Sequence, residues 1–347
     1  MRVGIYTHYA HCDQAYLAIR LVDFLRSHGI EFDLYSDSKP ARLKTPYDNV
    51  VKYRPRMSFT TWAKQQSCIV WTHVPKLEQL KYVNRFGLRT VIAPMWQELV
   101  SPYKKVLRKA DHVVALSDEC KELYTDIYKI KSAVMIPYDA GLPITKKTAK
   151  VNHKRVKIFL PWFDRNARCA NSDFLAAVSS LFTQMPDAEL TVAIMSSRFS
   201  PAVAKFFQGL GRKTQGRVKL IRNVQPAARA VLYADNDLTL YPAECDNFGL
   251  CGLTSINCGT PVLSFAISPQ LDFVYPDANG LLVKTAADYD ENGVVHAVPD
   301  YGALMEALQA LIDEPRHIDN LNKRINYNLI SRRKAFELGW LTVLGII

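Results

Sequence analysis

Short apolar runs alternate with helix-length amphipathic segments along almost the whole chain, and this rhythm limits the possible folds more than any other feature. Residues 3–6 form an apolar run, residues 14–29 an amphipathic segment that ends at Gly29, and residues 31–35 a second run. A short apolar run is typical of a strand buried on both faces, and a parallel neighbour requires a crossover helix. The pattern therefore predicts an α/β fold in which helices cover both faces of a parallel sheet.

The alternation runs through the chain twice. The first series continues with apolar runs at 68–71, 90–93, 112–116 and 133–136. Residues 141–154 are then polar and basic with little periodicity, as in a linker between domains. The second series follows, with runs at 156–160, 190–195, 218–221, 237–240, 261–265 and 281–283. We therefore expect two doubly wound, Rossmann-like domains.

Length and composition exclude several other classes. The 347 residues are 48% hydrophobic and 22% charged, enough for two ordinary cores. No apolar run approaches the roughly 18 residues that cross a membrane, and the N-terminus opens into a strand-like pattern. The seven cysteines include no C-x-x-C pair, which argues against a disulfide framework or a zinc site. We expect a cytoplasmic protein with reduced thiols and no metal.

Positive charge is concentrated in the first part of the chain. Residues 1–150 hold 24 Lys and Arg against 14 Asp and Glu, whereas residues 151–347 hold 20 against 19. Residues 39–109 alone hold 15 basic residues and three acids, Asp48, Glu78 and Glu98. Such a stretch can attract a polyanion or an anionic membrane surface. The alternative is a solvated surface that only keeps the protein soluble.

The most specific motif lies at residues 228–283. It reads ARAVLYADNDLTLYPAECDNFGLCGLTSINCGTPVLSF, and PDANGLLVK follows at 276–284. Residues 110–124 of the first half read ADHVVALSDECKELY. In this order, and covering most of the chain, these segments resemble the GT-B glycosyltransferases, in particular the retaining family 4 group. A phage enzyme that modifies DNA is one kind of member that the resemblance suggests.

The resemblance implies both an architecture and an activity. It implies an acceptor-side domain at 1–148, a nucleotide-sugar domain at 149–330 facing it across a cleft, and a C-terminal helix at 331–347 that packs back on the first domain. The implied reaction moves a hexosyl or pentosyl group from a nucleotide sugar, with a UDP-sugar expected as co-substrate. Family members of this kind retain the anomeric configuration and work without a metal.

The resemblance also assigns donor residues. A leaving diphosphate gains negative charge, which Arg or Lys side chains and the N–H groups at a helix start can stabilise. Arg165 aligns with the diphosphate-binding arginine of the family, and Arg168 can replace the family lysine, whose position falls on Ala170. The turn before a helix expected from about residue 251 supplies the N–H groups, and its residues are Asn247, Phe248, Gly249 and Leu250.

Two further positions correspond to the two glutamates of the family motif. Asp246 takes the first place and can accept hydrogen bonds from sugar hydroxyls, although an N-cap of the next helix is the alternative role. Thr254 takes the second place, where it offers one neutral hydroxyl to the ribose instead of a carboxylate. Glu244 is the competing acid, but its spacing from Phe248 does not fit the motif.

The acceptor side is less defined. His8, His11, Asp13 and His73 follow predicted strands of the first domain, where open α/β sheets place their ligands. Each can orient an acceptor hydroxyl, and each can equally be a structural residue. Cys12 and Asp13 replace the glycine pair of the family's first loop, so this loop cannot be assigned from the resemblance.

The basic stretch also suggests an acceptor, because aromatic residues are interleaved with its charges. A basic and aromatic surface suits a nucleic-acid strand with one base drawn out of the stack, and hydroxymethylated pyrimidine in DNA is the favoured hypothesis. A phage-encoded enzyme of this kind would work in the host cytoplasm. Two alternatives stay open: a peripheral membrane enzyme with a lipid-linked or polysaccharide acceptor, and a scaffold that binds sugar nucleotide or DNA without turnover. The aromatic residues are Tyr47, Tyr53, Phe59, Trp62, Tyr82, Phe86, Trp96 and Tyr103.

Overall fold

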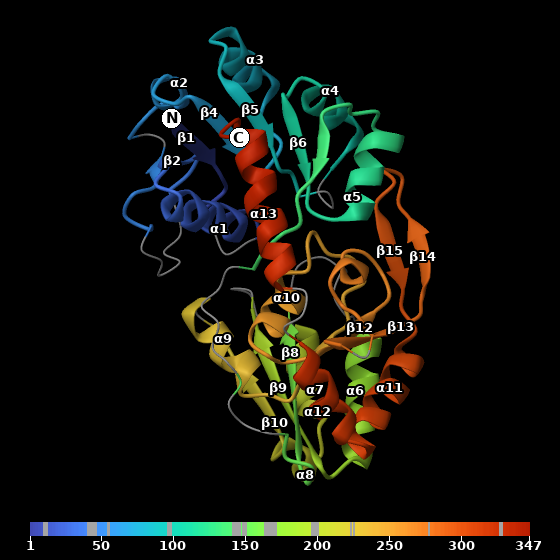
Figure 1. Cartoon of the computed structure of the whole chain (residues 1–347). Helices are drawn as coiled ribbons and strands as arrows, with labels where there is room; N and C mark the ends of the chain where they lie inside the picture. The colour runs from blue at the N-terminus through green and yellow to red at the C-terminus, as the bar shows by residue number, and fades with distance from the viewer. Residues whose placement is uncertain are drawn as a thin grey trace. The chain divides into compact units, whose positions relative to one another are not determined.

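The chain forms two compact units, seen in the computed structural model (Figure 1). Unit 1 comprises Met1–Gly141, Asp290–Val294 and Ile330–Ile347, and unit 2 comprises Leu142–Tyr289 and Val295–Leu329. The structure describes residues 1–9, 13–39, 47–53, 56–95, 99–140, 147, 151–162, 172–195, 201–222, 224, 226–276, 278–325 and 329–347.

Unit 1 is built on a parallel sheet with the strand order β3-β2-β1-β4-β5-β6-β7. The strands are β1 (Arg2–Tyr6), β2 (Glu31–Ser36), β3 (Lys52–Tyr53), β4 (Cys68–Trp71), β5 (Arg89–Ile92), β6 (His112–Ala115) and β7 (Ala133–Met135). The helices are α1 (Asp13–Ser27), α2 (Phe59–Ala63), α3 (Leu77–Arg85), the 3₁₀-helix η2 (Ser101–Tyr103), α4 (Lys104–Leu107), α5 (Asp118–Glu122), the π-helix η3 (Leu123–Ile127) and α13 (Leu329–Leu344).

A buried ionic cluster fixes α13 against the rest of unit 1. The Asp139 carboxylate accepts hydrogen bonds from Arg20 on α1 at 2.6 Å and from Arg333 on α13 at 3.1 Å. Phe336 of α13 packs edge-on against Phe24 of α1, with 5.9 Å between the ring centroids. The carboxylate thus pairs with the buried Arg20 and with the Arg333 side chain, which is 45% exposed, and such pairing is what makes a buried charge tolerable.

Unit 2 contains a second parallel sheet with the order β10-β9-β8-β11-β12-β13. Its strands are β8 (Val156–Trp162), β9 (Ala188–Ile194), β10 (Val218–Ile221), β11 (Leu238–Tyr241), β12 (Val262–Phe265) and β13 (Gly280–Val283). The helices are α6 (Ser172–Gln184), α7 (Pro201–Gly209), α8 (Arg212–Gln215), α9 (Pro226–Ala234), α10 (Leu250–Asn257), the 3₁₀-helix η4 (Gln270–Asp272), α11 (Tyr301–Asp313) and α12 (Arg316–Arg324).

The predicted α/β class with two parallel sheets is confirmed, and three strands are additional. β3 has only two residues, too few for any periodic pattern. β14 (Ala286–Tyr289) and β15 (Val295–Val298) form an antiparallel hairpin, in which all four residues of β14 are exposed. A strand without a buried face carries no apolar alternation, so sequence reasoning could not detect it.

Candidate functional site

The sequence motif of unit 2 forms one turn at the carboxyl end of β11, immediately before α10. Asp246 lies in this turn with only 8% of its surface exposed. Its Oδ2 atom accepts a hydrogen bond from the Tyr241 hydroxyl, and its Oδ1 atom accepts one from the Phe248 backbone N–H at 3.4 Å. The N-cap of α10 is Gly249, so the alternative role of Asp246 as a helix cap is wrong. Its carboxylate is held within the turn itself.

Gly249 has a conformational and a steric reason to be glycine. Its backbone is left-handed, with φ 73° and ψ 34°. A Cβ atom at this position would overlap the ring of Phe273, which is 3% exposed and therefore confined. The turn is thus closed from one side by an aromatic ring, and α10 begins directly at Leu250. The helix start was expected about one residue later.

Thr254 is less available to a ligand than its predicted ribose-binding role requires. It lies in the middle of α10 and is 2% exposed. Its hydroxyl donates a hydrogen bond of 2.6 Å to the Leu250 carbonyl, one helical turn earlier. The single proton that this side chain could donate is therefore already used inside the helix, because a threonine on a helix readily bonds back to the preceding turn.

Glu244, the competing acid, has a structural role. Its Oε1 atom accepts a 2.5 Å hydrogen bond from the Tyr301 hydroxyl, and its carbonyl accepts one of 2.7 Å from the Ala297 N–H. These bonds join the turn to the start of α11 and to β15. Asp246 is therefore the better candidate for ligand binding. Arg165, Arg168 and His11 lie outside the described residues.

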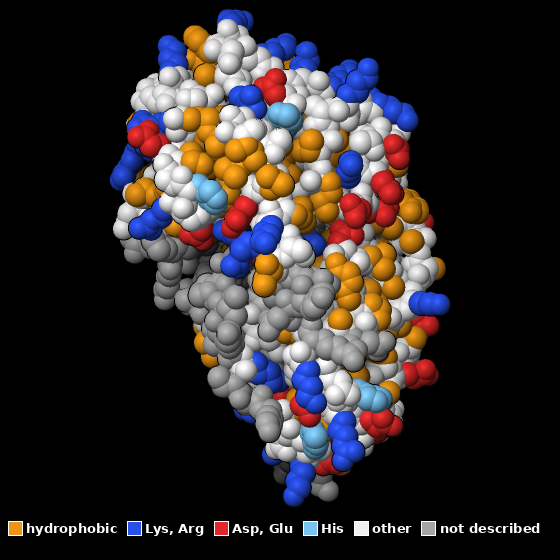
Figure 2. Space-filling view, viewed as in Figure 1, with side chains coloured by type: hydrophobic (Ala, Val, Ile, Leu, Met, Phe, Trp, Pro, Cys, Tyr) orange, Lys and Arg blue, Asp and Glu red, His pale blue; other side chains and the backbone are white. Residues whose placement is uncertain are grey.

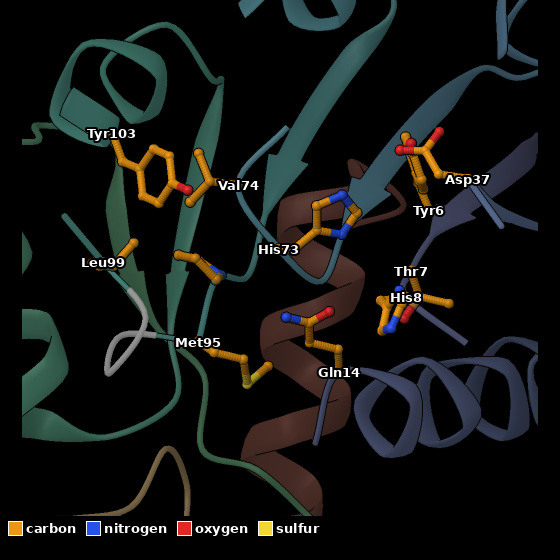
Figure 3. Close-up of a pocket in the computed structure, with 11 residues that line it drawn as sticks. Tyr6, Thr7, His8, Gln14, Asp37, His73, Val74, Met95, Leu99 and Tyr103 are labelled. Atoms are coloured by element: carbon orange, nitrogen blue, oxygen red, sulfur yellow. The ribbon is translucent and has the colours of Figure 1, made fainter. Parts of the chain in front are cut away.

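Unit 1 contains a pocket of about 270 Å³ at the carboxyl ends of its central strands (Figure 3). It brings together two of the predicted acceptor-side residues, His8 after β1 and His73 after β4. Gln14 of α1 is among the lining residues, while the side chain of its neighbour Asp13, a predicted acceptor-side residue, is not described. Further polar lining comes from Tyr6, Thr7, Asp37 and Tyr103, and the apolar lining from Val74, Pro94, Met95 and Leu99.

His73 is held in its neutral form. Burial lowers the pKa of its imidazole to about 4; the Asp37 carboxylate opposes this shift, and a smaller effect of His8 adds to it. The residue is partly exposed, but its Nδ1 atom is fully buried and has no hydrogen-bond partner among the described residues. The ring stands edge-on to Tyr6, with 4.8 Å between centroids. At neutral pH this side chain offers hydrogen bonding without positive charge.

Asp37 is a lining residue that sequence reasoning missed. It follows β2 directly, so the rule that selected His8 and His73 after their strands would have selected it too. Asp37 hydrogen-bonds Tyr6, and this contact, together with the larger effect of burial, raises the pKa of the Tyr6 phenol. Gln79 of α3 donates to the same phenol oxygen at 3.2 Å. The phenol is thereby fixed between an acceptor and a donor.

The aromatic residues expected to stack on bases lie partly inside unit 1 and partly on its surface. Trp62 is fully buried and stacks on Tyr35, with 4.9 Å between centroids and 28° between planes. Phe59 contacts both Tyr6 and Trp62, and Tyr47 is 7% exposed. Trp62 and Tyr47 are therefore engaged in packing, whereas Phe86 and Tyr103 are 51% and 37% exposed, so an aromatic nucleic-acid face stays a prediction for the exposed residues.

The basic residues of this segment are also partly engaged within unit 1. Arg108 donates two hydrogen bonds, of 3.1 and 2.8 Å, to the Tyr128 carbonyl, and the Lys104 ammonium lies 4.3 Å from the centre of the Tyr128 ring. Lys52 pairs with Asp33 at 2.8 Å. Figure 2 shows Lys and Arg side chains dispersed over the rim and face of unit 1, with uncharged and acidic surface between them.

Two further expectations concern metal and membrane. Among the described residues, no three His, Cys, Asp or Glu side chains gather in a way that could hold a metal ion. Within the same part of the chain, no helix combines the length and apolarity needed to cross a membrane.

The fold matches solved glycosyltransferase structures over nearly its whole length. HepE of Anabaena, solved with UDP and glucose, has a TM-score of 0.72 at 12% identity, with 99% of this chain and 100% of that one covered. Sucrose-phosphate synthase from Thermosynechococcus elongatus has a TM-score of 0.68 at 15% identity, covering 99% and 98%. The lipopolysaccharide outer core galactosyltransferase WaaB has 0.64 at 13%, covering 98% and 100%. No protein-family model and no curated protein sequence matches the chain.

These matches define the architecture as that of the GT-B glycosyltransferases, so the predicted fold class is confirmed. At such identities the likeness establishes the fold, and activity has to be argued from the sites.

Proposed function

We propose that the protein is a glycosyltransferase that moves a sugar from a nucleotide sugar, with a UDP-sugar as donor. The observation that carries this proposal is the Asp246–Leu250 turn before α10, located in a fold that matches HepE over its full length. HepE has been solved in complex with UDP-glucose as well as with UDP. The nucleotide site is proposed to lie in unit 2, and the acceptor site in unit 1.

Each part of the turn has a role in this proposal. The Asp246 carboxylate accepts hydrogen bonds from hydroxyls of the donor sugar, while Tyr241 holds it in place. The first N–H groups of α10 lack partners within the helix and point toward negative charge on the diphosphate. Arg165 and Arg168 supply the positive charge that the proposal still needs. Thr254 is not assigned to the ribose, because its hydroxyl is engaged in α10.

The proposed reaction proceeds with retention and without a metal. The bond between the anomeric carbon and the diphosphate oxygen breaks, and a bond from that carbon to an acceptor hydroxyl oxygen forms on the same face. The hydroxyl proton passes to the departing phosphate oxygen, so no protein base is required. The chain's contribution is to orient the sugar and to stabilise the charge that develops on the diphosphate.

The test is donor hydrolysis across a panel of UDP-, GDP- and ADP-sugars, followed by transfer assays. Slow hydrolysis of a UDP-sugar and its suppression in Asp246→Asn would support the proposal. Asp235→Asn is the matched control, since Asp235 is an exposed acid of the same unit outside the turn. No hydrolysis and no binding of any nucleotide sugar would refute the proposal and favour a scaffold without turnover.

The acceptor is tested separately with three candidates, scored by mass spectrometry. They are DNA containing hydroxymethylpyrimidine, anionic liposomes with a lipid-linked sugar, and soluble saccharides. The burial of Trp62 and Tyr47 weakens the support for DNA, whereas the polar pocket of unit 1 supports a saccharide. Incorporation of sugar into DNA alone would reverse this preference.

A further inference from the structure

The pocket of unit 1 has an unusual charge pattern for a site in such a basic segment. Its described lining contains one carboxylate, Asp37, and no lysine or arginine. In Figure 3 the Asp37 and Tyr6 side chains lie on one side of the His73 ring, and Gln14 reaches up from α1 on another. The described basic side chains of residues 39–109 are therefore not part of this lining.

The polar groups of the pocket are held by a rigid support. The hydroxyl of Thr72 donates to that of Thr7 at 2.8 Å, and both residues are fully buried. Their backbone N–H groups extend the sheet, with Thr7 bonded to the Tyr35 carbonyl at 3.0 Å and Thr72 to the Tyr6 carbonyl at 3.1 Å. His8 and His73 each follow one of these threonines. Such a support keeps the lining in one geometry, as a selective site requires.

The lining determines which ligand it can hold. Carboxylate, amide and neutral imidazole groups can accept or donate hydrogen bonds to hydroxyl groups. The buried Nδ1 of His73 has no partner among the described residues, and a buried polar atom of this kind normally has one. An anionic ligand would meet the Asp37 carboxylate with no lysine or arginine among the described lining residues to compensate it, which is unfavourable in a partly buried site. The volume, just under the range of about 300–1,000 Å³ usual for larger ligands, suits one small ring.

We propose that this pocket binds one uncharged sugar or polyol ring through Asp37, Gln14 and His73, and selects against its phosphorylated counterpart. The inference rests on the proposed function, for which it names the acceptor class. This uncharged acceptor differs from the polyanionic acceptor that the charge of residues 39–109 suggests. Asp37 is the specificity-determining residue, because it carries the only acidic charge among the described lining residues.

The test uses the full chain and compares matched pairs of probes by NMR. The probes are glucose and glucose 6-phosphate, galactose and galactose 6-phosphate, and myo-inositol and inositol 1-phosphate. The readout is the imidazole resonance of His73, identified by its loss in His73→Gln, so that phosphate binding elsewhere does not count. Measurement at about pH 8 keeps ordinary histidines neutral. We expect at least one neutral probe to shift this resonance at about tenfold lower concentration than its phosphorylated partner.

Variants of Asp37 test whether its negative charge causes the preference for neutral over phosphorylated probes. Asp37→Asn should reduce the preference for the neutral probe, and Asp37→Lys should abolish or reverse it. Asp126→Lys is the control, an equal charge change at an exposed residue of unit 1 outside the pocket. Circular dichroism verifies that each variant is folded.

The proposal is overturned if phosphorylated probes bind the pocket as well as neutral ones. It is also overturned if no neutral probe shifts His73 up to about 100 mM, or if the Asp37 variants leave the preference unchanged. Donor hydrolysis, measured separately, tests the proposed function. Donor hydrolysis without this selectivity would refute the proposed acceptor class but not the transferase activity. Selectivity without donor hydrolysis would refute the transferase activity but not the proposed ligand of the pocket.

Discussion

The two candidate sites differ in how the chain assembles them. The site of unit 2 is a continuous turn, in which Asp246 and the start of α10 are separated by three residues. The pocket of unit 1 is collected from separate strand ends and loops between Tyr6 and Tyr103. The turn is tightly packed, with Phe248 fully buried and Phe273 against Gly249, whereas the pocket is an open hollow. A continuous site can be found as a motif, but a dispersed site is visible only after the sheet has formed.

The largest effect expected from this difference is the intolerance of the turn to an added methyl group. Gly249→Ala would place a non-glycine residue in the left-handed region and press its Cβ against Phe273. We expect a loss of about 2–5 kcal/mol in the free energy of unfolding, from strain and overpacking together. Urea denaturation measures it.

The matched control is Gly211→Ala in the same unit. Gly211 has φ −62° and nothing within 4 Å of an added Cβ, so its substitution should cost about 1 kcal/mol or less. Equal losses for the two variants would mean that the turn is not the packed element described above.

The second effect separates binding from packing within the turn. Asp246→Asn keeps the size of the side chain and an oxygen for the Tyr241 hydroxyl, but removes the negative charge. Because hydrogen bonds to a charged acceptor are the stronger kind, sugar transfer should fall about 100-fold in kcat/KM. The thermal midpoint should change little. Full activity in this variant would show that Asp246 does not hold the donor.

Much of the fold could be predicted from the sequence, because strands such as β4 are continuous apolar runs between helix-length segments. The hairpin β14–β15 could not, since it exposes one strand completely. The Asp246 turn was predicted as a motif, while its hydrogen bonds to Tyr241 and Phe248 required the structure. Asp37 was missed although its position directly after a strand, the feature that indicated His8 and His73, could have predicted it. Thr254 could be aligned with a binding position, but its bond within α10 depends on the rotamer and not on spacing.

The third effect belongs to the pocket and follows from the neutral state of His73. Its pKa is lowered from 6.5 to about 4 in the folded protein, so the unfolded chain binds more protons between these values. Stability conferred by the neutral imidazole is therefore complete above about pH 6.5 and is lost as pH falls toward 4. When the pH is lowered from 7 to 5, protonation of this group in the unfolded chain should reduce the free energy of unfolding by about 2 kcal/mol. His73→Gln should remove that part of the pH dependence.

The control for His73 is His317→Gln, since the His317 side chain is 60% exposed. Urea denaturation of both variants at pH 7 and pH 5 gives the comparison. If the two variants have the same pH dependence as the original protein, the His73 imidazole is not held neutral and the pocket loses its uncharged donor and acceptor.

The smallest effect tests how far the turn extends into α10 as a binding element. Thr254→Val removes only a hydroxyl whose proton is already donated to the Leu250 carbonyl. Because that carbonyl keeps its place in the helix, the cost to stability should stay within about 1 kcal/mol. The Kd for UDP should change by less than about twofold, since no bond to the ribose is lost. A rise of about tenfold or more, corresponding to about 1.4 kcal/mol, would instead mean that the Thr254 side chain turns toward the ribose when nucleotide binds. The donor site would then include α10 as well as the turn, and the contrast between a continuous and a dispersed site would be smaller.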